Sequence, residues 1–302
     1  MTLARSTLVA SRYRGAIGVS TAFGTFGELL QGRLPEPDGD FLVTLPIARW
    51  SVATFQLNPT GRGVEVRPAR KRKARALAEM LLAGTGSEAG GALSIDSTLP
   101  EGKGLASSSA DLAATARAVG NALNLNLTPG TIERFLRRIE PTDGVLYPGI
   151  VAFHHRSVRL RASLGSLPSM TIVGVDEGGT VDTVEFNRLR KPFSAADQRE
   201  YARLLDMMSD AVAAHNLRAV GAIATRSAVM NQVLRPKRAL DAVRCICAEV
   251  GGLGVVAAHS GTMLGIMLDT RDPDYVTKLA ATVQACSGLT ASVSLHRTLS
   301  FD

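Results

Sequence analysis

Residues 100–111, P-E-G-K-G-L-A-S-S-S-A-D, hold the residue types best suited to binding an anion. Gly102 and Gly104 let the backbone curl closely around a charged group, and the N–H groups of a helix that follows would point at it. Lys103 can lie over phosphates, and a hydroxyl from the serines at 107–109 can bind Mg²⁺, because hard cations prefer oxygen ligands. The Walker A pattern G-x-x-x-x-G-K-[ST] does not fit the segment. We therefore interpret it as a phosphate loop of another kind, with a glycine-serine loop that ends in an ordinary helix N-cap as the alternative.

Two more glycine-containing segments lie far from this loop in the chain. Residues 258–262, A-H-S-G-T, separate two strand-like runs, and a plain hairpin turn is the alternative to a functional role. Residues 24–32, G-T-F-G-E-L-L-Q-G, place Glu28 and Gln31 among apolar neighbours. A buried polar side chain needs a hydrogen-bond partner or a function, so these two residues are candidates for substrate contact. A surface helical turn is the alternative for that segment.

The strands and helices expected around these segments follow different patterns in the two parts of the chain. The first part favours strands through its β-branched and aromatic residues, and the phosphate loop separates a strand from an Ala-rich helix. Strands are expected at residues 42–57, 64–66, 92–97, 151–153 and 158–164, and helices at 70–82, 112–123 and 128–139. The second part alternates strands at 170–175, 253–258, 263–268 and 290–295 with helices at 195–214, 218–233, 236–250 and 274–285. This alternation predicts an α+β sandwich.

The chain length of 302 residues suits two ordinary domains. A linker-like stretch, L-G-S-L-P-S, occupies residues 164–169. We therefore expect one domain at residues 1–166 and a second at residues 167–302, with the active site between them.

The charge of the chain is concentrated in one place. The formal net charge is +7, from 34 basic and 27 acidic residues. Six of the basic residues lie in the short run at 67–75, R-P-A-R-K-R-K-A-R. We expect this run to be a solvated helix face, and contact with ATP phosphates or a polyanion is the less favoured alternative.

Composition excludes several classes of protein. With 45% hydrophobic and 20% charged residues, the chain is neither disordered nor membrane-spanning, since no apolar run approaches about 18 residues. Three cysteines without a framework spacing favour a reducing, cytoplasmic setting. The first 20 residues show no cleavable leader and are expected to be mature protein. His154 and His155 are adjacent in a strand-like stretch, so one should be exposed and the other packed.

Taken together, the three glycine-containing segments resemble the motifs of the GHMP kinases, a superfamily that includes galactokinase, homoserine kinase and mevalonate kinase. Residues 100–110 are similar to its phosphate loop P-x-x-x-G-L-x-S-S-x-A. Residues 26–29, F-G-E-L, and 259–265, H-S-G-T-M-L-G, are similar to its N-terminal and C-terminal motifs and occur in the same order. The resemblance implies a GHMP kinase fold, with an N-terminal half like ribosomal S5 domain 2 and a C-terminal ferredoxin-like α/β sandwich.

Four segments narrow the resemblance to the L-threonine kinase branch, which makes O-phospho-L-threonine for cobalamin. They are G-E-L-L-Q-G at 27–32, K-G-L-A-S-S-S-A-D at 103–111, I-E-P-T-D at 139–143 and G-G-T-V-D-T at 178–183. The activity implied is phosphoryl transfer from ATP to the hydroxyl of L-threonine. The alternatives are another alcohol, such as homoserine or a sugar, and a non-catalytic protein that binds nucleic acid.

The resemblance also implies a role for each site residue. Asp143 faces the substrate hydroxyl as base or positioning group, and Lys103 offsets phosphate charge. Glu140 binds Mg²⁺ together with Ser109 or Ser108, and Glu133 competes for that role. The ATP loop comprises Pro100, Gly102, Lys103, Gly104, Leu105, Ala106, Ser107, Ser108 and Ser109. The acceptor pocket comprises Glu28, Gln31, Thr142, Asp143, Ser260, Gly261 and Thr262.

The first motif departs from the family at one point. Several members carry Arg or Lys just before its Gly-Glu pair, where this chain has Thr25 and Phe26. Lys103, or an arginine from elsewhere, must then supply any cation for the transferring phosphoryl group. The expected partners are ATP and a small hydroxylated substrate, with a homodimer as an option and no membrane or nucleic acid.

Overall fold

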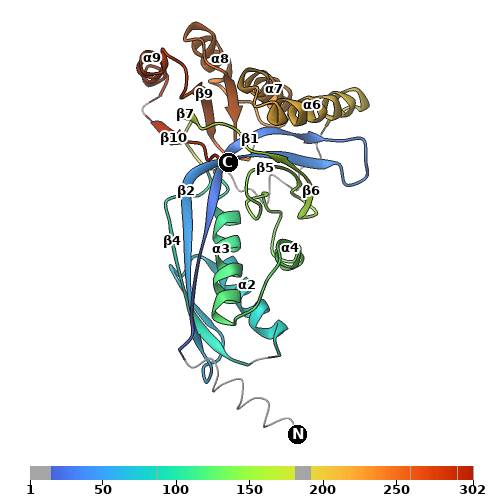
Figure 1. Ribbon diagram of the computed structural model, residues 1–302, viewed down its shortest axis with the longest axis vertical. Coiled ribbons are helices and arrows are strands. Elements are labelled where there is room, and N and C mark those ends of the chain that lie inside the picture. The colour runs from blue at the N-terminus through green and yellow to red at the C-terminus, as the bar shows by residue number, and fades with distance from the viewer. Residues whose placement is uncertain (1–14, 87, 181–191, 259, 291, 302) are drawn as a thin grey trace.

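A computed structural model describes residues 15–86, 88–180, 192–258, 260–290 and 292–301. The molecule is elongated, with two parts joined by long strands (Figure 1). One hydrogen-bonded path runs through both parts in the order β10-β7-β9-β8-β1-β2-β4-β3, and the β5–β6 hairpin joins it at β2. None of the described helices is both long and apolar enough to cross a bilayer.

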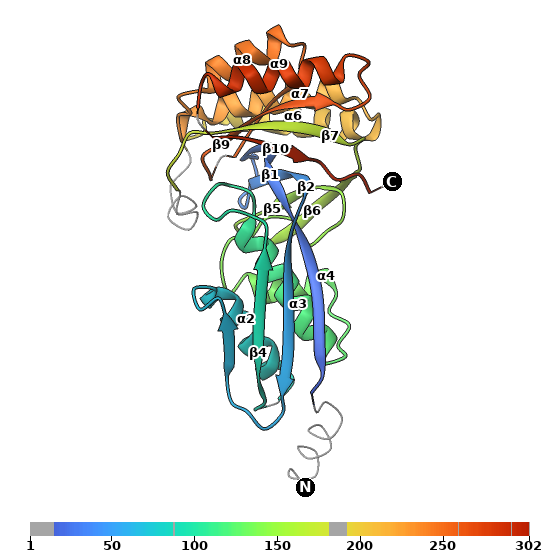
Figure 2. The ribbon, with the colours of Figure 1, turned by 90° about the vertical axis from the view of Figure 1, so that its left-hand side faces the viewer.

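The lower part is a sheet with helices on one face (Figure 2). Strands β1, β2 and β4 pair antiparallel, and β3 runs parallel to β4. The strands are β1 (Ile17–Arg33), β2 (Asp40–Asn58), β3 (Val64–Arg67) and β4 (Gly90–Ser97), followed later by β5 (Ile150–His154) and β6 (Arg159–Gly165). The helices are α2 (Arg72–Gly84), α3 (Ser107–Ala122) and α4 (Pro129–Leu136). Helix α3 is buried against β1 and β2, because most of its residues are small and apolar.

The upper part carries the alternation expected from the sequence. Its strands are β7 (Met170–Asp176), β8 (Gly254–Ala257), β9 (Met263–Asp269) and β10 (Val293–Arg297), all paired antiparallel. Its helices are α6 (Ala195–Ala213), α7 (Leu217–Met230), α8 (Leu240–Glu249) and α9 (Tyr275–Ser287), with a 3-10 turn at Asn231–Val233. The observed mixture confirms the predicted α+β class.

Strand β1 is the main element that the sequence did not reveal. Residues 24–32 form a buried strand, so the alternative of a surface helical turn is wrong. Phe26, Leu29 and Leu30 are fully buried there, which outweighs the weak strand preference of the neighbouring glycines. This strand carries Glu28 and Gln31 into the interior of the molecule.

The halves of the chain share a core. Its largest cluster contains Leu42 and Val151 from before the expected linker and Leu167 and Met208 from after it. The domain boundary at residues 166 and 167 therefore stays a prediction.

Candidate active site

The three glycine-containing segments meet through their backbones. The N–H of Gly27 donates to the carbonyl of Gly104 at 3.1 Å, and that of Thr25 donates to Leu105 at 3.3 Å. The N–H of Thr262 donates to the carbonyl of Lys103 at 3.3 Å. Segments more than 70 residues apart in the sequence are therefore joined by backbone hydrogen bonds into one continuous structure.

Close packing explains why glycines are needed there. Gly104 has a φ of +80°, and a Cβ on it would lie 2.5 Å from the Cβ of Ala258. A Cβ on Gly261 would lie 2.1 Å from the carbonyl oxygen of Lys103. Any side chain at either position would separate the loop from the third segment.

Helix α3 begins at the loop without a side-chain cap, five residues earlier than expected. Its N-cap residue, Ala106, is left-handed with a φ of +57°. The first N–H groups of the helix, from Ser107, Ser108 and Ser109, are therefore available to an anion, which the helix dipole also attracts. The alternative of an ordinary N-cap is wrong, because Ala106 has no side-chain group that could accept a capping hydrogen bond.

A cavity of about 570 Å³ opens in front of this helix end. Gly102 and the residues from Gly104 to Ser109 line it, whereas Pro100 and Lys103 do not. Opposite them, the cavity is lined by Glu28, Gln31, Glu140, Pro141, Thr142, Asp143, His155 and Ser260. The cavity thus brings together the loop and most of the expected acceptor residues.

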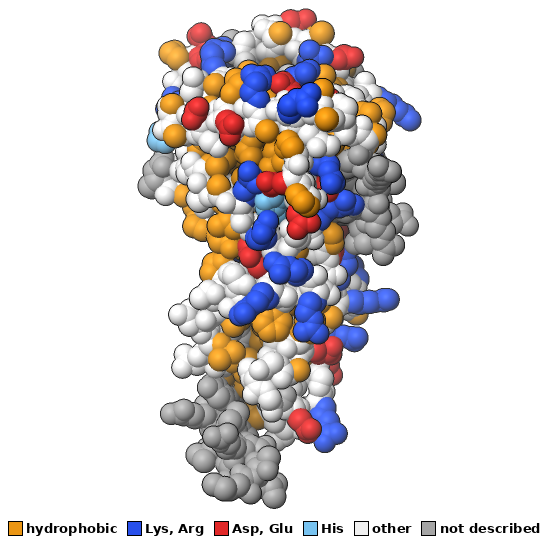
Figure 3. All heavy atoms as spheres, turned by 90° about the vertical axis from the view of Figure 1, so that its right-hand side faces the viewer, with side chains coloured by type: hydrophobic (Ala, Val, Ile, Leu, Met, Phe, Trp, Pro, Cys, Tyr) orange, Lys and Arg blue, Asp and Glu red, His pale blue; other side chains and the backbone are white. Residues whose placement is uncertain are grey.

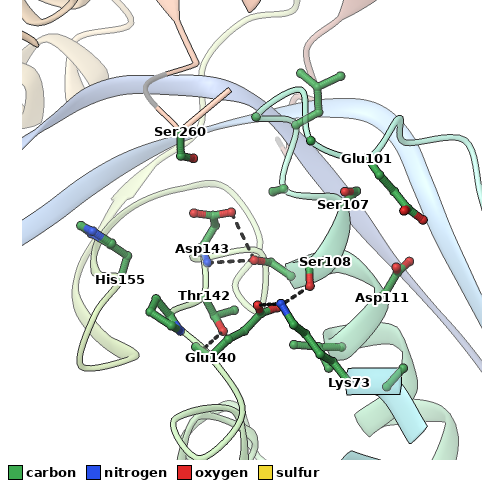
Figure 4. Close-up of a pocket in the computed structure, with 18 of the residues that line it drawn as sticks. Lys73, Glu101, Ser107, Ser108, Asp111, Glu140, Thr142, Asp143, His155 and Ser260 are labelled. Carbon is green, nitrogen blue, oxygen red and sulfur yellow. Dashed lines mark hydrogen bonds and ion pairs between the residues drawn. The ribbon is translucent and has the colours of Figure 1, made fainter. Parts of the chain in front are cut away.

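The serines of the loop pair separately with two carboxylates (Figure 4). Ser108 Oγ donates to Glu140 Oε1, while Lys73 Nζ forms an ion pair with Oε2 of the same carboxylate. Ser109 Oγ accepts from the N–H of Asp143 at 3.0 Å and lies 3.2 Å from Oδ2 of its carboxylate. Ser108, rather than Ser109, is therefore the hydroxyl beside Glu140.

Asp143 has the electrostatics of a proton acceptor. Burial, with the nearby charges of Glu28 and Glu140, raises the pKa of its carboxyl to about 7, although the hydrogen bond with Ser109 opposes the shift. A carboxyl poised near neutrality can accept a proton from an alcohol during transfer.

Glu133 lies outside this arrangement. Its carboxylate accepts from the hydroxyl of Tyr147 and from the N–H of Leu160, both at 2.8 Å. It thus anchors β6, and of these two glutamates Glu140 is the one that the fold brings to the phosphate loop.

The structure places Lys103 beside the cavity with its side chain held elsewhere. Its Nζ forms a 2.7 Å ion pair with Asp176 and donates to the carbonyl of Gly179 at 2.8 Å. Although burial opposes the shift, hydrogen bonds from Lys103 and Thr262 hold the pKa of Asp176 below its usual range. In this arrangement Lys103 ties the phosphate loop to β7.

The basic run at 67–75 is not simply a solvated face, which corrects our expectation. Arg70, Lys71, Arg72 and Lys73 line the cavity. Lys71 Nζ lies 2.5 Å from Asp111 and 2.7 Å from Glu101. Burial alone would lower the pKa of Lys71, but these hydrogen bonds raise it. Sequence reasoning missed these contacts because the partners lie 30–40 residues away.

The acceptor end of the cavity is lined by buried polar side chains. Glu28 and Gln31 are buried, and Gln31 Oε1 accepts no hydrogen bond within the described part of the chain. Ser260 reaches the cavity, whereas the hydroxyl of Thr262 donates to Asp176 at 2.5 Å and Gly261 packs on the loop. His259 and residues 181–183 of the expected motifs lie outside the described residues.

Three residues here were misjudged or missed. His154 and His155 are both 2% exposed, so the expectation that one is exposed is wrong, and His155 lines the cavity. Lys237 was not singled out, because R-P-K-R resembles an exposed basic turn. Its buried Nζ donates to the carbonyl of Gly261, and burial lowers its pKa to about 8. Lys237 therefore holds the segment at residues 258–262 in place through the carbonyl of Gly261.

The corner formed by Ser108 and Glu140 fits a divalent cation. It offers a hydroxyl and a carboxylate, the oxygen donors that Mg²⁺ prefers, and a lysine ammonium already occupies the position of a counter-ion there. The described residues contain no cluster of three or more His, Cys, Asp or Glu side chains, so nucleotide phosphates and water would have to complete the coordination.

Comparison with known proteins agrees with this geometry. Residues 71–147, which include the phosphate loop, Glu140 and Asp143, match the model of the GHMP kinases N terminal domain. These residues therefore form a GHMP kinase N-terminal domain. A GHMP kinase structure, that of homoserine kinase from Cytophaga hutchinsonii, superposes with a TM-score of 0.74 at 15% identity, covering 94% of this chain and 95% of that one. Mevalonate kinase from L. major gives 0.66 at 16%, covering 95% and 96%. The predicted GHMP kinase fold is confirmed.

Two curated relatives have the same name. An L-threonine kinase of Citrobacter freundii is 30% identical over 187 residues, which are 61% of this chain and 65% of the relative. An L-threonine kinase of Salmonella typhimurium is 28% identical over 263 residues, 85% of each chain. The first match thus spans just under two-thirds of the relative's length.

Proposed function

We propose that this protein is a GHMP kinase that transfers the γ-phosphoryl group of ATP to the side-chain hydroxyl of L-threonine, giving O-phospho-L-threonine and ADP. The observation that carries the proposal is the position of Asp143. Its carboxyl, with a pKa near 7, lies beside the uncapped end of α3 and close to the buried polar residues Glu28 and Gln31. The names of the two curated relatives favour threonine among alcohols.

The nucleotide end of the cavity is built for phosphates. The N–H groups of Ser107, Ser108 and Ser109 would donate to the phosphate oxygens, and the closely packed glycines hold these donors in place. Ser108 and Glu140 would hold Mg²⁺, which when bound neutralises charge on the phosphates and on the leaving oxygen.

At the acceptor end, Asp143 accepts the proton of the threonine hydroxyl as its oxygen forms a bond to the γ-phosphorus. The bond from that phosphorus to the β,γ-bridging oxygen breaks, and ADP leaves with the electron pair. Transfer of this kind relies on positioning and charge neutralisation, so a modest base is sufficient. The hydrogen bonds between Asp143 and Ser109 fix the base relative to the phosphate loop.

The buried residues of β1 explain a preference for an amino acid. The Glu28 carboxylate and the Oε1 atom of Gln31 are acceptors suited to a substrate ammonium group. A neutral alcohol would leave the Oε1 atom of Gln31 without a donor, which disfavours its binding.

The test is a product assay with Mg-ATP and a panel of alcohols. The panel contains L-threonine, L-serine, L-homoserine, galactose, N-acetyl-L-threonine and 1-amino-2-propanol. We expect phosphorylation of L-threonine and a large loss with N-acetyl-L-threonine, which lacks the ammonium group. Phosphate on galactose alone would contradict the amino-acid assignment, and no transfer to any alcohol would contradict the kinase proposal.

No observation favours nucleic acid as the partner. The basic residues Lys71, Lys73 and Arg75 pair with Asp111, Glu140 and Glu79. On the face drawn in Figure 3, basic and acidic side chains lie beside one another. The cytoplasmic location and the homodimer stay predictions.

A further inference from the structure

Lys73 occupies the position of a cation at the acidic corner of the cavity (Figure 4). Its Nζ pairs with Oε2 of Glu140, whose other oxygen accepts from Ser108 Oγ. The Glu140 side chain is 6% exposed, whereas that of Lys73 is 48% exposed. The buried carboxylate of Glu140 is thus neutralised by Lys73, whose half-exposed side chain can move away at little cost in buried contacts.

Other cations near the loop are held by different partners. Lys103 pairs with Asp176, and Lys71 lies between Asp111 and Glu101 with its side chain only 11% exposed. Arg70 and Arg72 also line the cavity, but within the described part of the chain Arg70 pairs with Glu101 and neither arginine forms an ion pair with Glu140. Lys73 is therefore the cation best placed for the expected position of the γ-phosphate.

We propose that Lys73 is the phosphate-binding cation of this active site. In the free enzyme it neutralises Glu140, and it moves to the terminal phosphate of the nucleotide when a divalent cation takes its place on Glu140 and Ser108. This inference rests on the proposed kinase function. It supplies the phosphate-binding cation that the first motif lacks, since Thr25 and Phe26 stand before its Gly-Glu pair in place of an Arg or Lys.

Charge and reach support this exchange. The divalent cation and the ammonium group compete for one carboxylate, so binding of the first releases the second. The four-carbon stem of Lys73 begins in the first turn of α2, at the cavity wall, and only part of it is buried. Its ammonium can then follow the phosphate oxygens, on which negative charge is spread in the transition state.

The experiment compares Lys73→Met with wild type and with Arg75→Met. Arg75 is a matched control because its side chain is 52% exposed, lies on the same helix and pairs weakly with Glu79, outside the cavity. Titration of the nucleotide-free enzyme with Mn²⁺ should show affinity raised about threefold in Lys73→Met, the size expected for loss of a half-exposed ion pair. Arg75→Met should match wild type.

The affinity for a nucleotide should change in the opposite direction from the affinity for Mn²⁺. Binding of Mg²⁺ with AMP-PNP, a non-hydrolysable ATP analogue, should weaken about tenfold in Lys73→Met, because a charged phosphate contact is lost. Turnover should fall about 100-fold, and Lys73→Arg should recover part of it.

Unchanged or weaker Mn²⁺ binding in Lys73→Met would overturn the exchange, and so would equal effects in Lys73→Met and Arg75→Met. Nucleotide affinity within twofold of wild type would overturn the phosphate contact. Both binding measurements can be made even if wild type phosphorylates no alcohol, so failure of the proposed function is distinguishable from failure of this inference.

Discussion

Two walls of the cavity are built in different ways. The wall at residues 102–109 presents backbone N–H groups that glycine packing holds in place. The wall at residues 140–143 presents carboxyl groups whose behaviour depends on burial and on partners from other elements. The donors of the first wall are backbone groups that do not titrate, whereas the second wall depends on a folded environment that raises the pKa of Asp143 to about 7.

The two lysines near the site show what this difference means. Lys103 belongs to the phosphate loop by sequence, yet its ammonium pairs with Asp176. Lys73 lies 30 residues earlier in an apparently solvated run, yet it pairs with Glu140 beside Ser108. A sequence motif therefore predicts the course of the backbone better than it predicts the partner of a long side chain.

Replacing the base should have the largest effect on the carboxyl wall. Asp143→Asn removes the proton acceptor and should lower turnover by about 10²–10⁴-fold. The backbone wall is untouched, so affinity for the ATP analogue should stay within about threefold of wild type. Steady-state kinetics and calorimetric titration check the two values, and unchanged turnover would exclude an essential base.

A substitution in the backbone wall should instead impair folding and nucleotide binding together. Gly104→Ala places a methyl group 2.5 Å from Ala258 at a φ of +80° and should destabilise the fold by about 1–3 kcal/mol. Gly130→Ala is the control, because nothing lies within 4 Å of its added Cβ. Denaturant unfolding measures both variants, and equal stabilities would show that the close packing is unimportant.

The pH dependence of stability should distinguish the two walls again. Because the folded protein raises the pKa of Asp143 from 3.8 to about 7, it binds this proton more tightly than the unfolded chain does. The resulting stability is present at low pH and is lost as the pH rises through about 7. Asp143→Asn should therefore be more stable than wild type at pH 8, by about 1–2 kcal/mol after allowance for its exposure to the cavity. The advantage should shrink at pH 5, and a constant difference in thermal unfolding would contradict the raised pKa.

The smallest effect is expected for the lysine of the loop. Lys103→Met breaks a partly exposed ion pair with Asp176 and should cost about 1 kcal/mol or less in stability. Its loss of turnover should be much smaller than that of Lys73→Met. A reversed order in parallel kinetic assays would return the phosphate-binding role to Lys103.

The sequence predicted the features that depend on local patterns. Helix α4 begins after Thr128, whose side chain accepts from the N–H of Thr131 as its N-cap position suggested. The α3 loop was found because glycines and serines mark it locally. Strand β1 was not, because burial of Phe26 and Leu29 overrides its weak strand propensity.

The partners of charged side chains could not be predicted, because they are set by tertiary packing. Nothing in the local sequence joins Lys73 to Glu140 or Lys237 to Gly261. The sequence offered both Glu133 and Glu140 as metal ligands, and only the fold shows that Glu133 is held by Tyr147.

The most direct test of the central claim is a competition between two isomeric substrates. The enzyme is given L-threonine and L-homoserine at equal concentration with limiting Mg-ATP, and the products are read by proton-coupled phosphorus NMR. A phosphate on the secondary hydroxyl of threonine couples to one proton, whereas one on the primary hydroxyl of homoserine couples to two. We predict that the threonine doublet dominates, and a dominant homoserine triplet would contradict the assignment of threonine as the acceptor.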